Sequence, residues 1–277
     1  MDDITPEMVL RAYCMGVFPM AKSRHAGDIG WYDPQLRGVL PIKTLHVPRR
    51  LARRVKQQPY RITFDCDFEG VIRSCADVRE DTWINDGIIA LYTELHKMGF
   101  AHSVEAWDGD VLAGGVYGLA LGGAFFGESM FSTRRDASKI SLVHLAARLW
   151  RRGFTLLDVQ FVNDHLVQFG VEEIPRAEYH RRLAAALDVQ ASFGGQSSGA
   201  AGDSKEPGSC SSAGTAGLSE TGSGAGVEAP PVSDDVAGAG ASSSDCSGFS
   251  LGASSDENSS EGFLDVLAFL HSITQTS

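Results

Sequence analysis

Two polar residues, Asp158 and Gln160, interrupt the mostly apolar stretch from Phe154 to Phe161. Gly153 precedes this stretch and the turn-forming pair Asn163-Asp164 follows it, so a buried strand is expected. Side chains alternate along a strand, which would place the carboxylate and the carboxamide on one face about 7 Å apart. Such groups cost free energy unless they are satisfied. They either bond nearby backbone or an arginine and serve the fold, or they belong to a functional site.

The densest cluster of basic residues predicts contact with phosphate. A helix is expected from Pro48 onward, with Leu51 and Val55 one turn apart on its buried face. Its other positions carry positive charge, at Arg49, Arg50, Arg53, Arg54 and Lys56. A nucleic-acid backbone is a natural partner for this helix, although a merely solvated helix face would have the same pattern.

Aromatic residues gather near the N-terminus, in Val17-Phe18-Pro19 and in Trp31-Tyr32-Asp33-Pro34. Their proline punctuation favours a loop over regular structure. Aromatic side chains on loops stack on nucleic-acid bases, but they also build local cores. Spacing alone leaves both interpretations open.

The charge of the chain, −11 over 277 residues, belongs to its C-terminal part. Residues 191–277 contain one lysine and 11 acidic residues, whereas residues 1–190 hold 23 Lys and Arg against 24 Asp and Glu. None of the cysteines forms a Cys-x-x-Cys pair or lies at zinc spacing from histidine, so reduced thiols in a cytosol-like compartment are expected. The polar N-terminus does not resemble a secretory peptide, and no apolar run reaches the roughly 18 residues of a membrane span.

Helix and strand signals divide the first 190 residues into an ordered series. Thr5-Pro6-Glu7 combines an N-cap, a first-turn proline and an acidic residue, and starts a helix that stops at Gly16. Further helices are expected over 67–76, 87–98, 137–152 and 176–187, and strands over 60–65, 102–107, 111–121 and 124–131. The last three strands form an antiparallel meander. The helix that follows would cross over to the strand of Asp158, making that strand parallel to the one ending near Phe131.

From Ala191 onward, Gly, Ser and Ala dominate and large apolar residues are few. This composition buries too little surface to offset the entropy of ordering, so a disordered tail is expected over 191–277. Glu261–Thr274 alone has the apolar spacing of a short amphipathic helix that could dock elsewhere.

The order of meander, crossover helix and open splay beside the last strand resembles the second half of the GNAT acyltransferase fold. GNAT enzymes hold the pyrophosphate of acetyl-CoA on a glycine-rich turn before the crossover helix. The corresponding stretch, Ser132–Lys139, contains no glycine. Backbone could not easily approach a pyrophosphate there, which disfavours a CoA-dependent enzyme.

Short motifs resemble a specific family more closely. They are Ala12-Tyr13 with Gly16-Val17-Phe18-Pro19, Trp31-Tyr32-Asp33-Pro34, Thr82-Trp83-Ile84, Ala101-His102-Ser103-Val104-Glu105, Gly114-Gly115-Val116-Tyr117-Gly118, Gly127-Glu128-Ser129-Met130-Phe131-Ser132, Ala137-Ser138-Lys139, Leu157-Asp158-Val159-Gln160 with Asn163-Asp164-His165, and Glu173-Ile174-Pro175-Arg176. Each is weak alone, but the set occurs in the order found in the bacterial leucyl/phenylalanyl-tRNA–protein transferases, over about residues 4–188. The long Gly/Ser tail departs from that family.

The resemblance implies an α+β fold in three parts. These are a small N-terminal domain over 1–45, a GNAT-like catalytic domain with a mixed sheet over 46–190, and the tail over 191–277. It implies transfer of Leu or Phe, with Met as a further donor, from aminoacyl-tRNA to the α-amine of proteins beginning with Arg or Lys, which marks them for N-degron proteolysis. Aminolysis of an ester is downhill, so no cofactor, ATP or metal is implied. A cytoplasmic monomer without membrane contact is expected.

The resemblance also implies catalytic roles for Asp158, Gln160 and Glu128. The Gln160 carbonyl oxygen, polarised by a link to Asp158, would draw a proton from the amine, or would orient the amine while the ribose hydroxyl or water relays the proton. Glu128 would attract the amine as an ionised carboxylate. The structural alternative for Glu128 is an ion pair with Arg134 or Arg135.

Further positions are implied to contact the substrates. The pocket for the transferred side chain would consist of Val116, Phe125, Met130, Leu142 and Leu157, with core packing as the alternative. Trp31 and Trp83 would face the terminal adenosine of the tRNA, and Asn163 would join substrate binding. The basic helix Arg49–Lys56 would hold acceptor-stem phosphates. Two other functions stay open: an acyl-CoA N-acyltransferase, and a non-catalytic RNA- or degron-binding protein.

Overall fold

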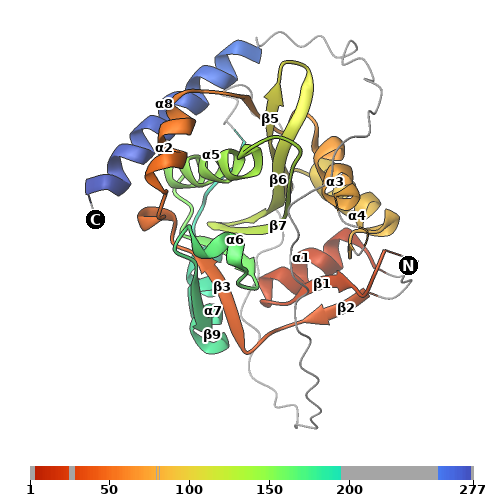
Figure 1. The fold of residues 1–277 in the computed structure, drawn as a ribbon. Helices are drawn as coiled ribbons and strands as arrows, with labels where there is room; N and C mark the ends of the chain where they lie inside the picture. Colours follow the sequence, from red (N-terminus) through yellow and green to blue (C-terminus); the bar gives the residue numbers. More distant parts are fainter. Residues whose placement is uncertain (1–3, 25–28, 79, 81, 195–254, 276–277) are drawn as a thin grey trace, which may run out of the picture. The chain divides into compact units, whose positions relative to one another are not determined.

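A computed structural model of the chain describes residues 4–24, 29–78, 80, 82–194 and 255–275. Its centre is a seven-stranded mixed sheet with the strand order β4-β5-β6-β7-β8-β3-β9 (Figure 1). The strands are β3 (Leu36–Leu40), β4 (Arg61–Phe64), β5 (Ala101–Asp108), β6 (Val111–Leu121), β7 (Ala124–Ser132), β8 (Leu156–Gln160) and β9 (Glu172–Pro175). Within the described residues, β7 and β8 pair in parallel and the other neighbours in this sheet are antiparallel.

The helices lie close to the positions expected from capping and periodicity. They are α1 (Pro6–Cys14), α2 (Arg49–Lys56), α3 (Phe68–Asp77), α4 (Asp86–Lys97), α5 (Ala137–Arg151), α6 (Asp164–Val167), α7 (Arg176–Leu187) and α8 (Ser255–Gln275), with a 3₁₀ turn, η1, at Ile42–Thr44. Thr5 caps α1 by accepting a hydrogen bond from the Met8 amide. The α+β class, the meander β5–β6–β7 and the crossover through α5 to a parallel β8 are therefore confirmed.

Side chains alternate between the two faces of the sheet and enter two separate apolar cores. Phe125 and Leu157 face the core that α2, α5 and α8 cover. Their chain neighbours, Phe126 and Leu156, face the other core, which contains side chains of α1, α3, α4 and α7. Each position along β7 and β8 is thereby assigned to one side of the molecule.

The N-terminal segment is more regular than its prolines predict. Instead of a loop over residues 17–34, the structure has a two-stranded antiparallel sheet of β1 (Phe18–Ala21) and β2 (Ile29–Tyr32). Phe18 lies opposite Tyr32, and their rings stack 5.9 Å apart. This cross-strand aromatic pair stabilises a hairpin that local turn signals do not indicate.

Strand β3 connects the N-terminal part of the chain with the central sheet. It falls within the predicted N-terminal domain, yet it pairs with β8 and β9 in the central sheet. Neither β3 nor β9 was predicted, because both are short and owe their structure to partners distant in sequence. The site described below depends on this pairing.

Helix α8 contradicts part of the predicted disordered tail. The helix covers Ser255–Gln275 and contains the amphipathic segment Glu261–Thr274 recognised in the sequence. The buried side chains, spaced i, i+3, i+4 and i+7, are Val266, Phe269, Leu270 and Ile273. This stripe supplies the apolar area that the Gly/Ser-rich composition lacks on average. Residues 195–254 of the predicted tail lie outside the described residues.

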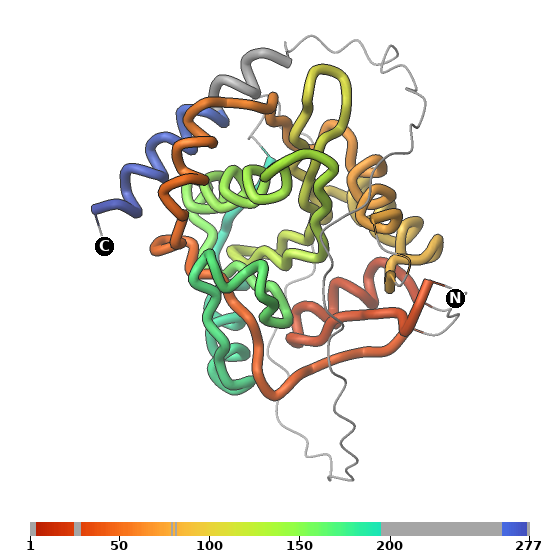
Figure 2. Tube along the Cα trace, in the orientation of Figure 1, coloured from red at the N-terminus to blue at the C-terminus, as the bar shows by residue number. Residues whose placement is uncertain are grey.

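Helix α8 packs on α5 and β4, and in the Cα trace it lies on the same side of the molecule as α2 and α5 (Figure 2). The Phe269 ring lies 6.0 Å from that of Trp150. Asp265 lies 3.4 Å from Arg151, adding an ion pair at the edge of the contact. The C-terminal helix is thus part of the core under α5.

Candidate functional site

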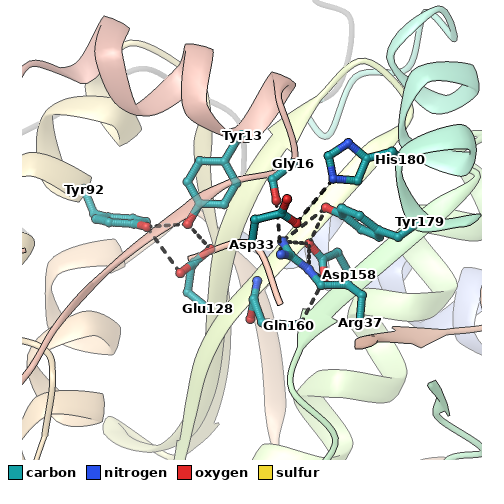
Figure 3. Close-up of polar contacts among 10 residues, drawn as sticks. All are labelled: Tyr13, Gly16, Asp33, Arg37, Tyr92, Glu128, Asp158, Gln160, Tyr179 and His180. Carbon is teal, nitrogen blue, oxygen red and sulfur yellow. Dashed lines mark hydrogen bonds and ion pairs between the residues drawn. The ribbon is translucent and has the colours of Figure 1, made fainter. Parts of the chain in front are cut away.

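The parallel strands β7 and β8 separate part-way along their length. Their pairing extends from Ala124 and Leu156 to Phe126 and Asp158, but β7 continues to Ser132 and β8 to Gln160. Beyond that point the two strands no longer pair with each other. We call this opening the splay. Asp158, Gln160 and Glu128, three predicted catalytic residues, lie at or just beyond the point where it begins (Figure 3).

Asp158 is fully buried and is saturated with hydrogen-bond donors. Its carboxylate accepts from Nε and Nη2 of Arg37, at 2.9 and 2.7 Å, and from the Tyr179 hydroxyl at 2.8 Å. It also accepts from the backbone amide of Gln160 at 2.9 Å. Asp158 therefore has the arginine and backbone partners of a structural carboxylate, and it uses one of them to hold the neighbouring Gln160.

Arg37 is the counter-charge of this network and is 1% exposed. Its Nη1 donates to the Gly16 carbonyl oxygen at 3.1 Å. Its guanidinium lies 4.5 Å from the Phe18 ring and 4.4 Å from the Tyr179 ring. Burial alone would lower the pKa of Arg37, but hydrogen bonds and Coulomb attraction from Asp158 outweigh burial and raise that pKa. Arg37 is therefore charged, and its guanidinium lies between the two aromatic rings.

Gly16 orients its carbonyl toward Arg37 by ending α1 in the left-handed region, with φ of 83°. A Cβ atom at this position would lie 3.0 Å from the ring of His180, so both conformation and space require glycine. His180 in turn lies 3.3 Å from Asp33. The ends of α1 and β2 are thus tied to α7 beside the buried pair (Figure 3).

Gln160 ends β8 with φ of 56°, a left-handed conformation that is costly for a residue with a Cβ. The bond from its amide to Asp158 helps to hold that conformation. Its side chain is largely buried, and within the described residues its Nε2 has no hydrogen-bond partner. The expected link between Asp158 and the Gln160 carboxamide is therefore wrong. Asp158 contacts the backbone of Gln160 and leaves the carboxamide available.

Glu128 is the extra residue of a β-bulge. Tyr117 pairs with Ser129, but the next residue, Gly118, pairs with Gly127, so Glu128 has no opposite number on β6. Bulges redirect side chains and are frequent beside active sites. This one turns the Glu128 carboxyl toward α1 and α4 rather than toward α5.

Two tyrosines bind the Glu128 carboxyl. The hydroxyl of Tyr13 donates to Oε1 at 2.7 Å and that of Tyr92 to Oε2 at 3.2 Å. The proposed ion pair of Glu128 with Arg134 or Arg135 is absent, because those arginines lie next to Asp108 and Asp136. Desolvation raises the pKa of Glu128 from 4.5 to about 8, against the opposing hydrogen bond from Tyr13. At this pKa most of the carboxyl is protonated at neutral pH, whereas the sequence led us to expect a carboxylate.

The predicted side-chain pocket lies on the other side of the sheet. Its five residues all belong to or pack against the core under α5, and four of them are 1–3% exposed: Val116, Phe125, Leu142 and Leu157. Met130 is only partly buried and lies on β7 beyond its pairing with β8. Of these five residues, Met130 alone lies on the part of β7 beyond its pairing with β8, in the splay.

The comparisons with known proteins agree on one family. A profile described as "Leucyl/phenylalanyl-tRNA protein transferase" matches residues 39–184, more than half of the chain. A second, described as "Leucyl/phenylalanyl-tRNA protein transferase N-terminal domain", matches residues 2–35. The chain belongs to the leucyl/phenylalanyl-tRNA protein transferase family. It is accordingly a transferase, and the resemblance found in its motifs is confirmed.

Members of the leucyl/phenylalanyl-tRNA protein transferase family from several bacteria are more than half identical to the chain. A relative from Hyphomonas neptunium is 57% identical over 201 residues, covering 72% of this chain and 78% of the relative. One from Cereibacter sphaeroides is 54% identical over 190 residues, covering 69% and 88%. One from Caulobacter vibrioides is 54% identical over 206 residues, covering 73% and 95%. All three are named leucyl/phenylalanyl-tRNA–protein transferase.

The two tryptophans and the asparagine predicted to bind substrate lie on the surface or near it. Trp31 is on β2 and is 40% exposed. Trp83 precedes α4 and packs, partly buried, on the core beneath α3 and α4. Asn163 is exposed and caps α6 by accepting from the Leu166 amide at 3.0 Å. These three predicted positions are therefore accessible to a ligand to very different degrees.

The basic helix α2 has the expected two-faced character. Leu51 and Val55 are buried, whereas Arg49, Arg50, Arg53 and Lys56 are exposed. Arg54 is partly buried and lies 3.6 Å from Asp136 at the start of α5. A cavity of about 290 Å³ borders the end of this helix, but none of the predicted site residues lines it. α2 therefore presents a row of positive charge as a surface rather than as a pocket.

Sequence reasoning missed four members of the polar network, Arg37, Tyr13, Tyr92 and Tyr179, as functional residues. Arg37 is the lone charge in the apolar run 36–40, which is a signal of a buried ion pair. The tyrosines lie on the buried faces of α1, α4 and α7, where a polar tip needs a partner. Among the described residues, no cluster of three or more His, Cys, Asp or Glu could hold a metal ion, and no helix has the length and apolarity to cross a bilayer.

Proposed function

We propose that this transferase moves Leu or Phe, with Met as a further donor, from aminoacyl-tRNA to the α-amine of proteins that begin with Arg or Lys. The product would carry a new N-terminal residue that marks it for N-degron proteolysis. Family membership supports the transfer itself. The acceptor and the biological outcome rest on the family resemblance of the motifs.

The reaction needs positioning and proton transfer rather than an energy source. A bond forms between the acceptor nitrogen and the aminoacyl carbonyl carbon, while the bond from that carbon to the ribose oxygen breaks. One proton leaves the nitrogen and one arrives at the ribose oxygen, so no redox partner, ATP or CoA is consumed. Holding both substrates in an attack geometry can supply much of the rate enhancement.

The observation that carries the proposal is the state of the Gln160 carboxamide. It is largely buried at the splay, its Nε2 has no partner among the described residues, and its backbone is held by Asp158 in a strained conformation. An unpartnered buried polar group is costly, and strain of this kind gathers at functional sites. We assign Gln160 the orientation of the amine or the ester. Asp158 acts as a positioning residue through the Gln160 backbone.

We further propose that the catalytic domain has a GNAT-like fold in which aminoacyl-tRNA replaces CoA. The splay between β7 and β8 supports this proposal. The amide of Ser138, in the first turn of α5, donates to the Ser132 hydroxyl at 3.2 Å. That amide is therefore already occupied where a pyrophosphate would need backbone donors. The N-terminal part, with β1 and β2, would form the second and smaller unit.

The transferred side chain is proposed to enter the splay beside Met130 and to press on Phe125 and Leu157. Shape would admit Leu, Phe and Met more readily than β-branched Ile and Val, at about 1–3 kcal/mol per methylene. The acceptor stem would lie along the exposed arginines and lysine of α2. Trp31, Trp83 and Asn163 would contact the terminal adenosine and its neighbours. The enzyme is proposed to act as a cytoplasmic monomer.

One assay tests the donor and the acceptor together. The full chain is incubated with Leu-tRNA, Phe-tRNA, Met-tRNA or acetyl-CoA and with reporter proteins that begin with Arg, Lys or Gly, and intact mass is measured. Addition of Leu, Phe or Met to the Arg and Lys reporters alone is expected. Acetylation would favour an acyl-CoA N-acyltransferase. Binding of tRNA without any mass change would favour a non-catalytic RNA-binding role.

Two sets of variants test the residues. Gln160→Ala and Asp158→Ala should lose transfer, whereas Gln57→Ala, on an exposed glutamine, should not. Full transfer by either site variant would refute its assigned role. Charge reversal at Arg50 and Arg53 should weaken tRNA binding and reduce its salt slope by roughly 0.7–0.9 for each phosphate that is no longer neutralised, while transfer from a minimal aminoacyl-adenosine is kept.

A further inference from the structure

Glu128, Tyr13 and Tyr92 form a closed triangle of oxygen atoms. The Tyr13 and Tyr92 hydroxyls lie 2.7 Å apart, and each also contacts the Glu128 carboxyl, at 2.7 and 3.2 Å respectively. The three side chains come from α1, α4 and the bulge of β7, so the triangle joins segments far apart in the sequence (Figure 3). Both tyrosines are fully buried.

The number of protons in this triangle depends on the state of Glu128. Each of the three contacts needs one proton between its two oxygens, and each tyrosine hydroxyl supplies one. An ionised Glu128 adds none, so two protons would have to serve three contacts. A protonated Glu128 supplies the third, and every contact can then be a hydrogen bond around a closed ring. The triangle can therefore hold Glu128 in either state, as a carboxylate that accepts from both tyrosines or as an acid that closes the ring.

The surroundings make the carboxyl the member of the triangle that titrates near neutral pH. Burial raises the pKa values of Tyr13 and Tyr92 well above 10, so their hydroxyls keep their protons. For Glu128, burial raises the pKa most, the tyrosine hydrogen bonds lower it, Asp158 raises it and Arg37 lowers it, giving a pKa of about 8.

Tyr117, on β6, is a further titratable group near this carboxyl. Burial raises the pKa of Tyr117 well above 10, so it remains neutral across the working range. Its ring lies 5.8 Å from that of Tyr92. Its hydroxyl is buried and has no hydrogen-bond partner among the described residues. It is thus a hydroxyl in the same core but outside the triangle.

We infer that Glu128 carries the proton of the transfer reaction and that Tyr13 and Tyr92 are the positioning residues that hold its carboxyl for this task. Glu128 gives its proton to the ribose oxygen as the ester bond breaks. It takes a proton from the nitrogen as the new amide bond forms, so the acid is regenerated in each cycle. This inference rests on the proposed aminoacyl transfer, and it gives Gln160 an orienting role only.

The chemistry of the acceptor fits such a carrier. A protein α-amine has a pKa of roughly 7.7–8.0, close to that of Glu128. Proton exchange between groups of matched pKa has little driving force in either direction, which is the best condition for acid–base catalysis at that pH. An ordinary exposed carboxyl would be ionised and too weak a base to take this proton.

The test is the pH profile of single-turnover transfer from Leu-tRNA to an Arg-reporter, with four variants. In the wild type, transfer should fall above about pH 8, where Glu128 loses its proton. Tyr92→Phe and Tyr13→Phe each remove a donor to the carboxylate, which raises the Glu128 pKa and should move this fall to higher pH. Glu128→Gln should lower the transfer rate by roughly 10²–10⁴-fold without the fall, and with tRNA KM unchanged.

Tyr117→Phe is the matched control, since it removes a buried hydroxyl that does not touch Glu128, and its profile should equal that of the wild type. Thermal unfolding of each variant shows whether it is folded. An unchanged pH profile in folded Tyr13→Phe and folded Tyr92→Phe, or full transfer by Glu128→Gln, would overturn the inference while leaving the proposed function intact. A wild-type chain that adds no residue would instead overturn the proposed function.

Discussion

Asparagine in place of Asp158 should cost far more stability than the loss of a surface ion pair. The change keeps the shape of the side chain but leaves the Arg37 charge buried without its counter-charge. Arg37 is 1% exposed and Asp158 0%, so water cannot replace the lost partner. Removing one member of a buried pair typically costs about 3–5 kcal/mol. Because each 1.4 kcal/mol is roughly a tenfold change, the unfolded fraction should rise between a hundredfold and several thousandfold.

The same pair allows a double-mutant cycle. Removing both charges, in Arg37→Met with Asp158→Asn, leaves no buried ion, so the double variant should be more stable than Asp158→Asn alone. The coupling should be of the order of 0.5–3 kcal/mol. Both quantities follow from urea unfolding at pH 7, in which the midpoint and slope give the free energy of unfolding.

An exposed ion pair provides the control. Arg134 lies 3.7 Å from Asp108, and both side chains are more than half exposed. Asp108→Asn should change the free energy of unfolding by at most about 1 kcal/mol. If Asp158→Asn behaved like this control, or if its effect simply added to that of Arg37→Met, the description of Arg37 and Asp158 as a buried ion pair would be refuted.

Three further outcomes concern stability. Phe269→Ala should destabilise the fold by about 3–5 kcal/mol because this ring is buried between α8 and α5. Leu264→Ala, on a 66% exposed residue of the same helix, should change the free energy of unfolding little. Equal effects of the two variants in urea unfolding would show that α8 does not pack there. The pKa of Glu128 is raised to about 8, so the folded chain holds a proton that the unfolded chain releases above about pH 4.5, and the stability from this group is lost as pH rises through 8. Glu128→Gln should flatten this decline. Parallel plots of the free energy of unfolding against pH for the variant and the wild type would contradict the prediction. Burial lowers the pKa of His144 to about 4, so stability from its neutral form is present above about pH 6.5 and is lost as pH falls through 4. His144→Leu should therefore lose less free energy of unfolding on acidification than the wild type. An equal loss would count against a buried neutral imidazole.

The helices and the meander could be predicted because their signals are local. Thr5 caps α1 by accepting a hydrogen bond from the amide three residues ahead of it. Gly109, with φ of 61°, forms the turn between the adjacent strands β5 and β6. The parallel strand β8 was predictable from handedness rules once the crossover helix was recognised. Such features depend on a few neighbouring residues, and their physics is visible in a short window of sequence.

The site was only half predictable because its contacts are non-local. Asp158 and Gln160 were identified as a buried polar pair, but Arg37 is 121 residues away from Asp158 and lies on β3, a short strand whose partners are distant in sequence. The charge state of Glu128 depends on Tyr13 and Tyr92, which the fold brings from two separate helices. Residue types can show that a carboxyl is present, whereas only packing decides whether it is ionised.

Helix α8 is joined to the rest of the described fold through residues 195–254, so its docking on α5 is formally an intramolecular binding step. While the chain is continuous, the fraction of molecules with α8 docked does not depend on protein concentration. A single proteolytic cut within 195–254 would make the same contact bimolecular, and α8 would then dissociate on dilution. The cut protein would behave as a two-chain complex whose stability rises with concentration, and a synthetic α8 peptide added in excess would restore the intact form.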